Sequence, residues 1–350
     1  MRRIRRLQLA LATTLIGLLL SASPALACGG LIGPNGAVNL LRTTTFAGYH
    51  AGVEHYVTSF EFAGGGGAFG SITPLPGIPS SVERGGDWTL QRLIQETSPL
   101  RATADLEAFA EAPAGADVEI LLETTIDALD ITVLKGGGDE VGTWAAAQGF
   151  RLPPDAPEVL DFYASRSPIF LAAAFDADAA AERGQAVGDG TPVHVTIPTP
   201  DPWVPLRILG LGKNGAERVE ADVYLLTDRQ PAMLPQPVGE GLFLDHSAAA
   251  TRSLLDDLRS DAGMEWVPKA AWLSKVRIDA EVGDLRYDLA IDASGQGTPS
   301  RLAAGLDVPG VPLAPTDDPS FRALLMVALM LIASGVGLVA MPLPAARTRG

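Results

Sequence analysis

The sequence predicts an α+β fold with mainly antiparallel, mixed sheets, a few short packed helices and one C-terminal transmembrane helix. Glycine and proline account for 38 and 27 of its 350 residues, which is typical of many turns between short strands. Strand-like segments, then two helices, then further strands follow one another along the chain, an order that favours α+β. Residues 323–341 are apolar and uncharged. A helix of that length rises about 1.5 Å per residue and spans about 28 Å, close to the hydrocarbon core of a bilayer.

The chain opens with a secretory signal peptide, which we place at residues 1–27. A basic start precedes an apolar stretch, and the small residues Ala25 and Ala27 form an A-x-A cleavage site. An uncleaved N-terminal anchor is the alternative, although the apolar stretch is short for a membrane span. Arginines and no acidic residues follow the C-terminal run, so residues 342–350 are predicted as a short basic cytoplasmic tail. We therefore expect a single-pass protein of the cell membrane, extracytoplasmic in its bulk, unless the C-terminal run is itself a cleaved signal.

Cleavage after Ala27 would leave Cys28, the only cysteine of the chain, as the first mature residue. A cysteine at this place indicates either lipid attachment, as in bacterial lipoproteins, or a free or intermolecularly paired thiol. The usual lipoprotein signal has leucine three residues before the cysteine, where this chain has Ala25. Both alternatives stay open, and an intrachain disulfide is excluded.

The residues between the two targeting segments form one predicted extracytoplasmic α+β domain, residues 28–293. An Ala-rich, acidic connector at residues 100–116 would mark the boundary if the domain has two subdomains. Residues 294–320 are rich in Gly, Pro, Ser and Asp, and we interpret them as a stalk that leads to the transmembrane helix.

The first half of the domain begins with strand-forming segments. Residues 37–50 are rich in β-formers and residues 53–62 alternate, which predicts a hairpin around Ala51-Gly52. Residues 69–79 are predicted to run extended but not as a central strand, because they contain repeated prolines. Asp87 is predicted to cap a short helix that ends before Ser98-Pro99. The remaining elements predicted in this half are strands at 118–122 and 130–134 and helices at 140–148 and 158–164.

The second half is richer in strands. The apolar segment 169–175 predicts a buried strand. Leucines at helical spacing predict a helix over 247–260, with Ser247 as its N-cap. Residues 284–291 alternate and are predicted as an exposed strand. The other strands predicted in this half lie at 193–197, 204–209 and 218–227.

One ordered series of segments carries a family resemblance. The segments are Ile131–Leu134, Trp144, Gln148–Pro153, Val159–Tyr163, Phe170–Ala174, Pro205–Ile208 and Val223–Asp228, preceded by Cys28–Gly30 and Phe69–Pro76. With them the chain resembles, over most of residues 28–235, a family of exported prokaryotic proteins known as domain of unknown function 2330. The resemblance implies export and this type of fold. Its motifs are packing and turn motifs, so it implies no active site, and Leu31–Gly33 stands where some members have a second cysteine.

His50, Glu54 and His55 are the candidate metal ligands, because two histidines and a carboxylate suit zinc. Their spacing differs from that of the zinc proteases, whose two histidines lie one helical turn apart. On a strand, Glu54 and His55 would point to opposite faces. The alternative is a turn flanked by exposed polar residues. If His194 or His246 lies within reach of His50 or His55, the metal site is favoured.

Other motifs fit structural roles better. Gly210–Gly215 matches the dinucleotide fingerprint, but a predicted strand follows it instead of a helix, so a turn is expected. Asp245-His246-Ser247 sets the residue types of a catalytic triad side by side, where the groups cannot converge. Asp176, Asp178 and Glu182 lack the glycine of a calcium loop and are interpreted as a solvated acidic turn.

The charge and the targeting segments decide the predicted function. The chain has 26 basic and 41 acidic residues and a net charge of −15, which argues against nucleic acid as a partner. We predict a non-catalytic binding or scaffold module of the bacterial cell envelope, held at the membrane by residues 323–341, without a cofactor and with an envelope protein as candidate partner. The alternative is a metal-dependent hydrolase that uses His50, Glu54 and His55.

Overall fold

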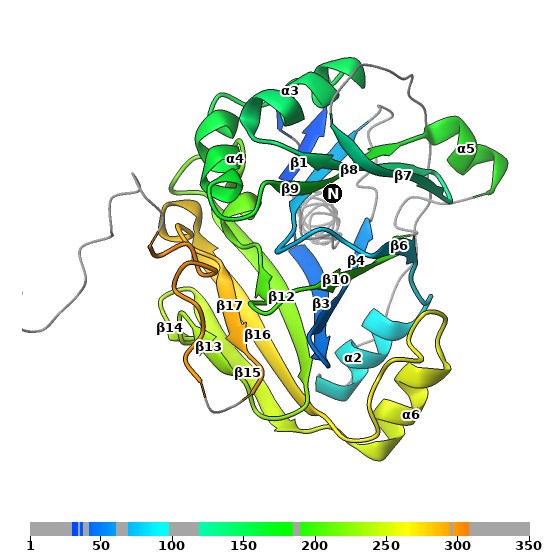
Figure 1. Cartoon of the computed structure of the whole chain (residues 1–350), viewed down its shortest axis with the longest axis vertical. Helices are drawn as coiled ribbons and strands as arrows, with labels where there is room; N and C mark the ends of the chain where they lie inside the picture. Colours follow the sequence, from blue (N-terminus) through cyan, green and yellow to red (C-terminus); the bar gives the residue numbers. More distant parts are fainter. Residues whose placement is uncertain are drawn as a thin grey trace, which may run out of the picture. The chain divides into compact units, whose positions relative to one another are not determined.

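The computed structural model describes residues 30–33, 36–37, 42–60, 69–97, 119–184, 190–294 and 297–307. The chain divides into two units, Met1–Pro309 and Gly310–Gly350, and all of the described residues belong to the first. Two large, mostly antiparallel sheets with short helices make up most of this unit (Figure 1). The predicted α+β class is therefore confirmed.

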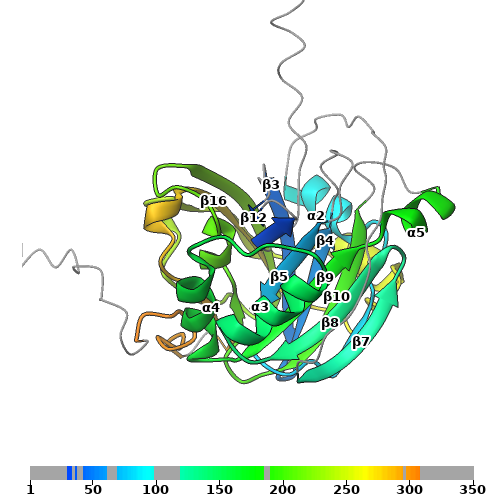
Figure 2. The same ribbon diagram turned by 90° about the horizontal axis from the view of Figure 1, so that it is seen from above.

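One sheet has six strands in the order β2-β1-β5-β9-β8-β7, each antiparallel to its neighbours. The strands are β1 (Gly30–Gly33), β2 (Gly36–Ala37), β5 (Gly70–Pro74), β7 (Ile120–Ile126), β8 (Leu129–Lys135) and β9 (Ile169–Phe175). β9 is buried along its whole length, as its unbroken apolar sequence predicts. Helices α3 (Gly138–Ala147) and α4 (Ala156–Ala164) lie beside this sheet, on the side away from the other large sheet (Figures 1 and 2).

The other large sheet has eight strands in the order β14-β15-β16-β12-β3-β4-β10-β6. The strands are β3 (Arg42–His50), β4 (Val53–Phe60), β6 (Ser81–Arg84), β10 (Thr191–Pro198), β12 (Arg218–Thr227), β14 (Val238–Gly239), β15 (Leu242–Ala249) and β16 (Trp272–Glu281). The predicted hairpin of β3 and β4 is confirmed, and β3 is joined to β12 by the one parallel pairing of the described sheets. Helices α2 (Thr89–Thr97) and α6 (Arg252–Ser260) lie side by side against this sheet (Figure 1).

A small third sheet and short helical turns complete the described fold. The sheet consists of β11 (Trp203–Val204), β17 (Leu289–Asp292) and β13 (Ala232–Leu234), with β17 in the middle. The short helices are α5 (Ala177–Glu182) and the 3₁₀ turns η1 (Arg207–Gly210) and η2 (Val282–Asp284).

The inner faces of the two large sheets share one hydrophobic core. Ala47 of β3 and Tyr56 of β4 belong to it, together with residues of β8 and β9 from the facing sheet. The neighbouring residues Phe46 and Val57 belong instead to a second core, formed with α2 and α6 on the outer face. Because successive side chains of a strand point to opposite faces, each residue of β3 and β4 is assigned to one of these two environments.

Two predicted elements were wrong. In one a distant side chain determines the backbone conformation, and in the other the helix has its N-cap later in the chain than predicted. Of residues 204–209 only Val204 belongs to a strand, β11, since the Asp288 carboxylate accepts the backbone N–H of Leu206 and Arg207, at 2.6 and 3.0 Å, and the chain turns into η1. The helix predicted from Ser247 begins only at Arg252. Its N-cap is Thr251, which accepts the Leu254 N–H, while residues 247–249 still belong to β15.

Two further predictions were wrong about where a strand lies in its sheet. β5 is an inner strand between β1 and β9, although residues 69–79 were predicted to stay outside a central strand. The backbone hydrogen bonds of β5 to its neighbours are retained because Pro74 is its last residue and the other prolines follow it. The strand predicted as exposed at 284–291 is β17, whose residues Leu289, Ala290 and Ile291 are buried between β11 and β13.

No helix among the described residues is long and apolar enough to cross a membrane. The predicted signal peptide, the connector at 100–116 and the predicted span at 323–341 lie outside the described residues. Residues 297–307, in the predicted stalk, contact the domain: the Asp288 backbone N–H donates to the Ala304 carbonyl at 3.0 Å, and Arg166 binds the Ala303 carbonyl.

Candidate functional site

The three predicted metal ligands lie on two faces of the eight-stranded sheet. Glu54 shares the inner face of β4 with Tyr56, and His55 shares the outer face with Val57. His50, at the end of β3, places its Nδ1 atom 2.7 Å from an oxygen of Asp228. Within the described ranges, no group of three or more His, Cys, Asp or Glu side chains is placed to hold a metal ion.

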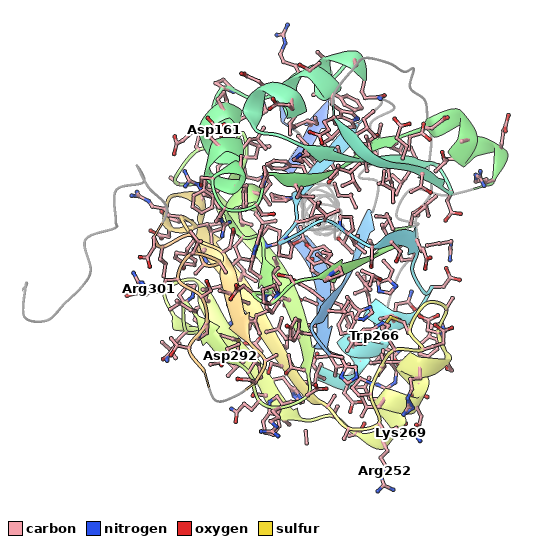
Figure 3. The ribbon with its side chains drawn as sticks, viewed as in Figure 1. Asp161, Arg252, Trp266, Lys269, Asp292 and Arg301 are labelled. Atoms are coloured by element: carbon pink, nitrogen blue, oxygen red, sulfur yellow. The ribbon has the colours of Figure 1, made fainter. Side chains whose placement is uncertain are left out.

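The structure instead brings His55 together with His194 on the outer face. His55 Nδ1 and His194 Nε2 are 3.0 Å apart, so one ring donates a hydrogen bond to the other. The His55 ring also stacks on Trp266, with ring centroids 3.8 Å apart and planes within 3° of parallel. Trp266 belongs to the loop after α6, near α2 (Figure 3). Gly48 of β3 is paired with His55 of β4 and leaves room for Trp266, because a Cβ atom at this position would overlap the indole ring.

Both histidines of this pair are held neutral. Burial, together with the charges of His194 and His50, lowers the pKa of His55 to about 3. Burial also lowers the pKa of His194 to about 4, against the charge of Glu265, which raises it. Neutral imidazoles can ligate a metal, but Glu54 cannot join them because it lies on the opposite face of the sheet.

A stripe of polar side chains runs along the inner face of β3 and β4. Tyr49 is paired with Glu54 at one end and Thr45 with Thr58 at the other. Tyr56 lies between the two pairs, and we call these five residues the inner stripe. Aliphatic residues of the neighbouring strands flank the stripe on both sides: Val223 and Leu225 of β12, and Val193, Val195 and Ile197 of β10.

Three of the five residues of the inner stripe have unused hydrogen-bonding groups. Thr45, Glu54 and Thr58 are 0%, 0% and 2% exposed. Among the described residues, their hydroxyl and carboxyl oxygens have no hydrogen-bond partner, and neither has the hydroxyl of Ser71 on the facing sheet. Because an unsatisfied buried polar group costs about 1–3 kcal/mol, such groups normally pair with protein, water or a ligand. The stripe can therefore donate and accept hydrogen bonds to a small polar molecule.

The Glu54 end of the stripe is acidic. Burial raises the pKa of Glu54 to about 8; the backbone N–H of Trp203 is near enough to oppose this shift but is not in hydrogen-bonding geometry with either oxygen. Tyr49 donates its hydroxyl to the Thr199 carbonyl at 2.9 Å. Burial raises the pKa of Tyr49, and the charges of Glu54, Asp201 and Asp292 raise it further.

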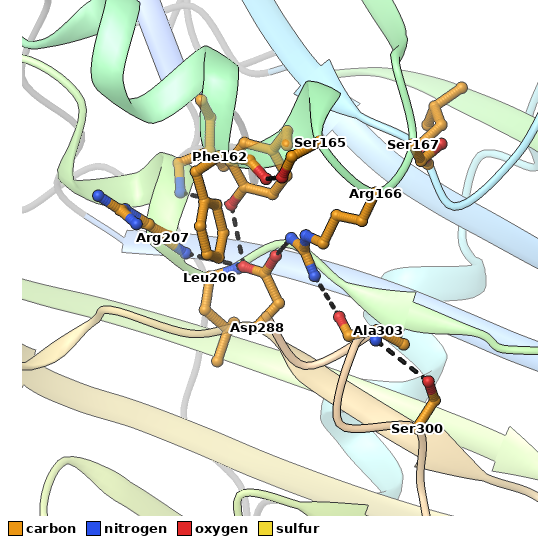
Figure 4. A network of polar contacts seen from close by, with 12 residues as sticks. Phe162, Ser165, Arg166, Ser167, Leu206, Arg207, Asp288, Ser300 and Ala303 are labelled. Carbon is orange, nitrogen blue, oxygen red and sulfur yellow. Dashed lines mark hydrogen bonds and ion pairs between the residues drawn. The ribbon is translucent and has the colours of Figure 1, made fainter. Parts of the chain in front are cut away.

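A second buried polar cluster contains Arg166 and Asp288. The two side chains are 2% and 0% exposed and form an ion pair. Asp288 also accepts the Tyr163 hydroxyl at 2.9 Å and the backbone N–H of Leu206 and Arg207 (Figure 4). These contacts join α4, η1 and β17. Removing one partner of such a buried ion pair is strongly destabilising, which assigns the cluster a structural role.

The other motifs belong to a turn, a strand and a helix. Gly210–Gly215 forms the end of η1 and turns, and β12 follows it instead of a helix, so the predicted turn is confirmed. Asp245 binds Arg277 at 3.0 Å, and Asp176 accepts the backbone N–H of Ala179 at the start of α5. Cys28 lies outside the described residues.

Sequence reasoning named Glu54 and His55 but missed their surroundings. The threonine run before Phe46 places Thr45 at an inward position of β3, which was a usable signal once the hairpin register was fixed. Trp266 could not be found in this way, because it comes from a loop about two hundred residues later in the chain.

Comparison with solved structures finds baculovirus P35. Intact P35 matches with a TM-score of 0.38 and 8% identity, over 72% of this chain and 96% of P35. A mutated P35 after caspase cleavage matches with a TM-score of 0.37 and 8% identity, over 72% of this chain and 99% of that one. Similarity at this level supports no conclusion about fold or function.

Comparison with curated proteins finds no match. A family model described as an uncharacterized protein conserved in bacteria (DUF2330) matches residues 23–233. The match covers every residue of the inner stripe, whereas Trp266 and Asp288 lie beyond it.

Proposed function

The chain belongs to the bacterial family DUF2330, and from this membership we propose that it is a membrane-tethered, extracytoplasmic binding or scaffold module of the cell envelope that holds a small polar ligand between its two large sheets. The leader at residues 1–27 supports export, and the uncharged run at residues 323–341 supports the tether. An envelope protein is the macromolecular partner we expect at its surface, and the net charge of −15 argues against nucleic acid.

The unused hydrogen-bonding groups of the inner stripe are the observation that carries the binding role. A core built only for stability would continue the aliphatic lining of β10 and β12 across β3 and β4. The chain instead buries Thr45, Glu54 and Thr58 there, and no described residue forms a hydrogen bond with their side-chain oxygens. A bound molecule would supply the missing hydrogen bonds and offset the cost of burying these groups.

A metal-dependent hydrolase is the second candidate, because His194 approaches His55. Its predicted ligands His50, Glu54 and His55 do not converge, so such a site would have to rely on the histidine pair. Elemental analysis of the full-length protein tests this alternative. Stoichiometric zinc that is lost in His55→Ala would support it, and a metal-free, folded protein would exclude it.

The tether is tested with reporter fusions to the full chain. Alkaline phosphatase, which is active only outside the cytoplasm, should be active when inserted after Asp307 and inactive when fused after Gly350. The reverse pattern, or activity at both positions, would contradict the proposed topology.

The ligand is tested by native mass spectrometry of the full-length protein purified in mild detergent. The wild-type protein should carry a small-molecule adduct that the double variant Thr45→Val/Thr58→Val loses. Thr44→Val is the matched control, because Thr44 neighbours Thr45 on β3 but shares the outer face with Phe46. A wild-type protein without any adduct, or an adduct that persists in the double variant, would refute the binding role.

A further inference from the structure

We propose that the ligand of the inner stripe is an elongated organic cation that places an ammonium group on Glu54 and a second polar end at Thr45 and Thr58. This inference rests on the proposed binding function and adds the chemical class of the ligand. It follows from the charge at one end of the stripe, from the distance between the two ends, and from what lies between and beside them.

The buried carboxyl group at the Glu54 end suits a positive partner, beside which it can ionise. Glu54 is fully buried. Within the part of the chain that the structure describes, neither of its carboxyl oxygens has a hydrogen-bond partner, and no arginine, lysine or histidine forms an ion pair with it. The carboxyl groups of Asp201 and Asp292 add negative charge near Tyr49 at the same end. A buried carboxylate is stable only beside a compensating charge. An ammonium group supplies this charge together with N–H donors for both oxygens.

A monatomic cation does not fit this end equally well. Magnesium and calcium require six or more oxygen ligands, and zinc requires about four ligands. No group of three or more His, Cys, Asp or Glu side chains in the described part of the chain is arranged to provide them. An ammonium group needs only a few acceptors, and a single carboxylate satisfies much of this requirement.

The spacing of the stripe sets the length of the ligand. Glu54 and Thr58 are four residues apart on β4, which corresponds to about 13 Å along a strand. Thr45 faces Thr58 directly across the hairpin, so two hydroxyl groups mark the far end. A molecule that uses both ends is therefore chain-like and carries hydrogen-bonding groups at or near both termini.

The middle and the flanks of the stripe select a slender ligand. Ala47 and Tyr56 lie opposite each other between the two polar pairs, and Ala47 carries only a methyl group beside the Tyr56 ring. Methylene groups pack well on such a ring, and a further ammonium group would gain a cation–π contact there. The aliphatic residues of β10 and β12 on either side favour a narrow alkyl chain over a hydroxylated ring.

Access is most direct at the Glu54 end. Glu54 is two residues from Gly52 in the exposed turn of the hairpin, and Asp201 in the neighbouring loop is exposed as well. The net charge of −15 attracts cations toward the whole surface. A test must therefore separate binding at Glu54 from non-specific adsorption to an acidic protein.

The experiment measures spermidine binding to the full-length protein in detergent at physiological salt by isothermal titration calorimetry. Spermidine is an elongated triamine, n-butylammonium presents one ammonium group, and hexane-1,6-diol is a neutral molecule with two polar ends. We expect spermidine to bind the wild-type protein with 1:1 stoichiometry. Glu54→Gln keeps the shape of the side chain and removes its charge, and it should weaken spermidine binding about tenfold or more. Thr45→Val/Thr58→Val should weaken spermidine binding several-fold and leave n-butylammonium binding unchanged.

The controls separate the two proposals. Glu123→Gln removes an exposed carboxylate of β7 and should bind spermidine as the wild-type protein does. Equal spermidine affinity of the wild-type protein and Glu54→Gln would overturn the inference, as would the absence of spermidine binding. If hexane-1,6-diol or a co-purifying neutral molecule binds instead, and is lost in the double threonine variant, the binding function stands and the cationic class is wrong. If none of the probes binds and no adduct co-purifies, both proposals fail.

Discussion

Replacing Glu54 with glutamine should stabilise the protein at neutral pH and leave its stability in acid unchanged. Burial raises the pKa of this carboxyl group from 4.5 to about 8. A group whose pKa is raised on folding contributes its stability fully below the unfolded-state pKa and loses it as the pH rises through the folded-state pKa. The Glu54 contribution is therefore lost between about pH 4.5 and pH 8. At pH 7.5 the loss is about 4 kcal/mol, from about three pH units at about 1.36 kcal/mol each.

Urea unfolding of both proteins at pH 4.5, 6.0 and 7.5, after bound small molecules have been removed by dialysis, measures this effect. The free energy of unfolding of Glu54→Gln should exceed that of the wild-type protein by almost nothing at the lowest pH and by about 4 kcal/mol at the highest. Glu123→Gln, on the exposed side of β7, should show no such trend. A difference that does not change with pH, or one below about 1 kcal/mol at pH 7.5, would refute the reasoning. It would mean that water or a partner already solvates the Glu54 carboxylate.

The remaining predictions concern the other buried groups. Gly48→Ala should displace Trp266, cost about 1–3 kcal/mol of unfolding free energy and shift the tryptophan emission; an unchanged spectrum would contradict the packing described. His55→Gln/His194→Gln should retain more of its stability in acid than the wild-type protein, because a pKa lowered on folding costs stability as the pH falls below 6.5. Urea unfolding should show that the drop in unfolding free energy between neutral pH and pH 5 is smaller for the double variant than for the wild-type protein, by about 1 kcal/mol or more. The same pH dependence of unfolding free energy in both proteins would contradict this prediction. Arg166→Met should cost about 3–5 kcal/mol, since it leaves a buried carboxylate without its counter-ion; thermal unfolding at the wild-type temperature would contradict this.

Local patterns were sufficient wherever the chain itself decides the conformation. The strand predicted at 218–227 is observed with the same bounds, because its apolar, β-branched residues read as a buried strand without reference to any partner. The helix predicted at 140–148 is observed one or two residues earlier, with Val141, Trp144 and Ala145 buried as their spacing indicates.

Prediction failed where a residue far away in sequence sets the backbone or completes a cluster. The sequence of segment 204–209 does not indicate that Asp288 accepts hydrogen bonds from its backbone N–H groups. The choice between Ser247 and Thr251 as N-cap depended on how far β15 pairs with β16. The candidate site shows the same division: the alternation of β4 predicted the opposite faces of Glu54 and its neighbour, but only the pairing of β4 with β10 brings the two histidines together.

The parallel pairing of β12 with β3 has a consequence for how the chain is completed. β12 lies between β3 and β16, yet β16 begins at Trp272, well after the end of the family match at residue 233. A fragment that stopped there would expose the long edge of β12 and leave Arg166 without Asp288, which invites edge-to-edge aggregation. Because the chain is made from its N-terminus, both cores can close only after the last strands are present. These strands complete the fold, and a fragment that ends before Asp288 should be sensitive to proteolysis.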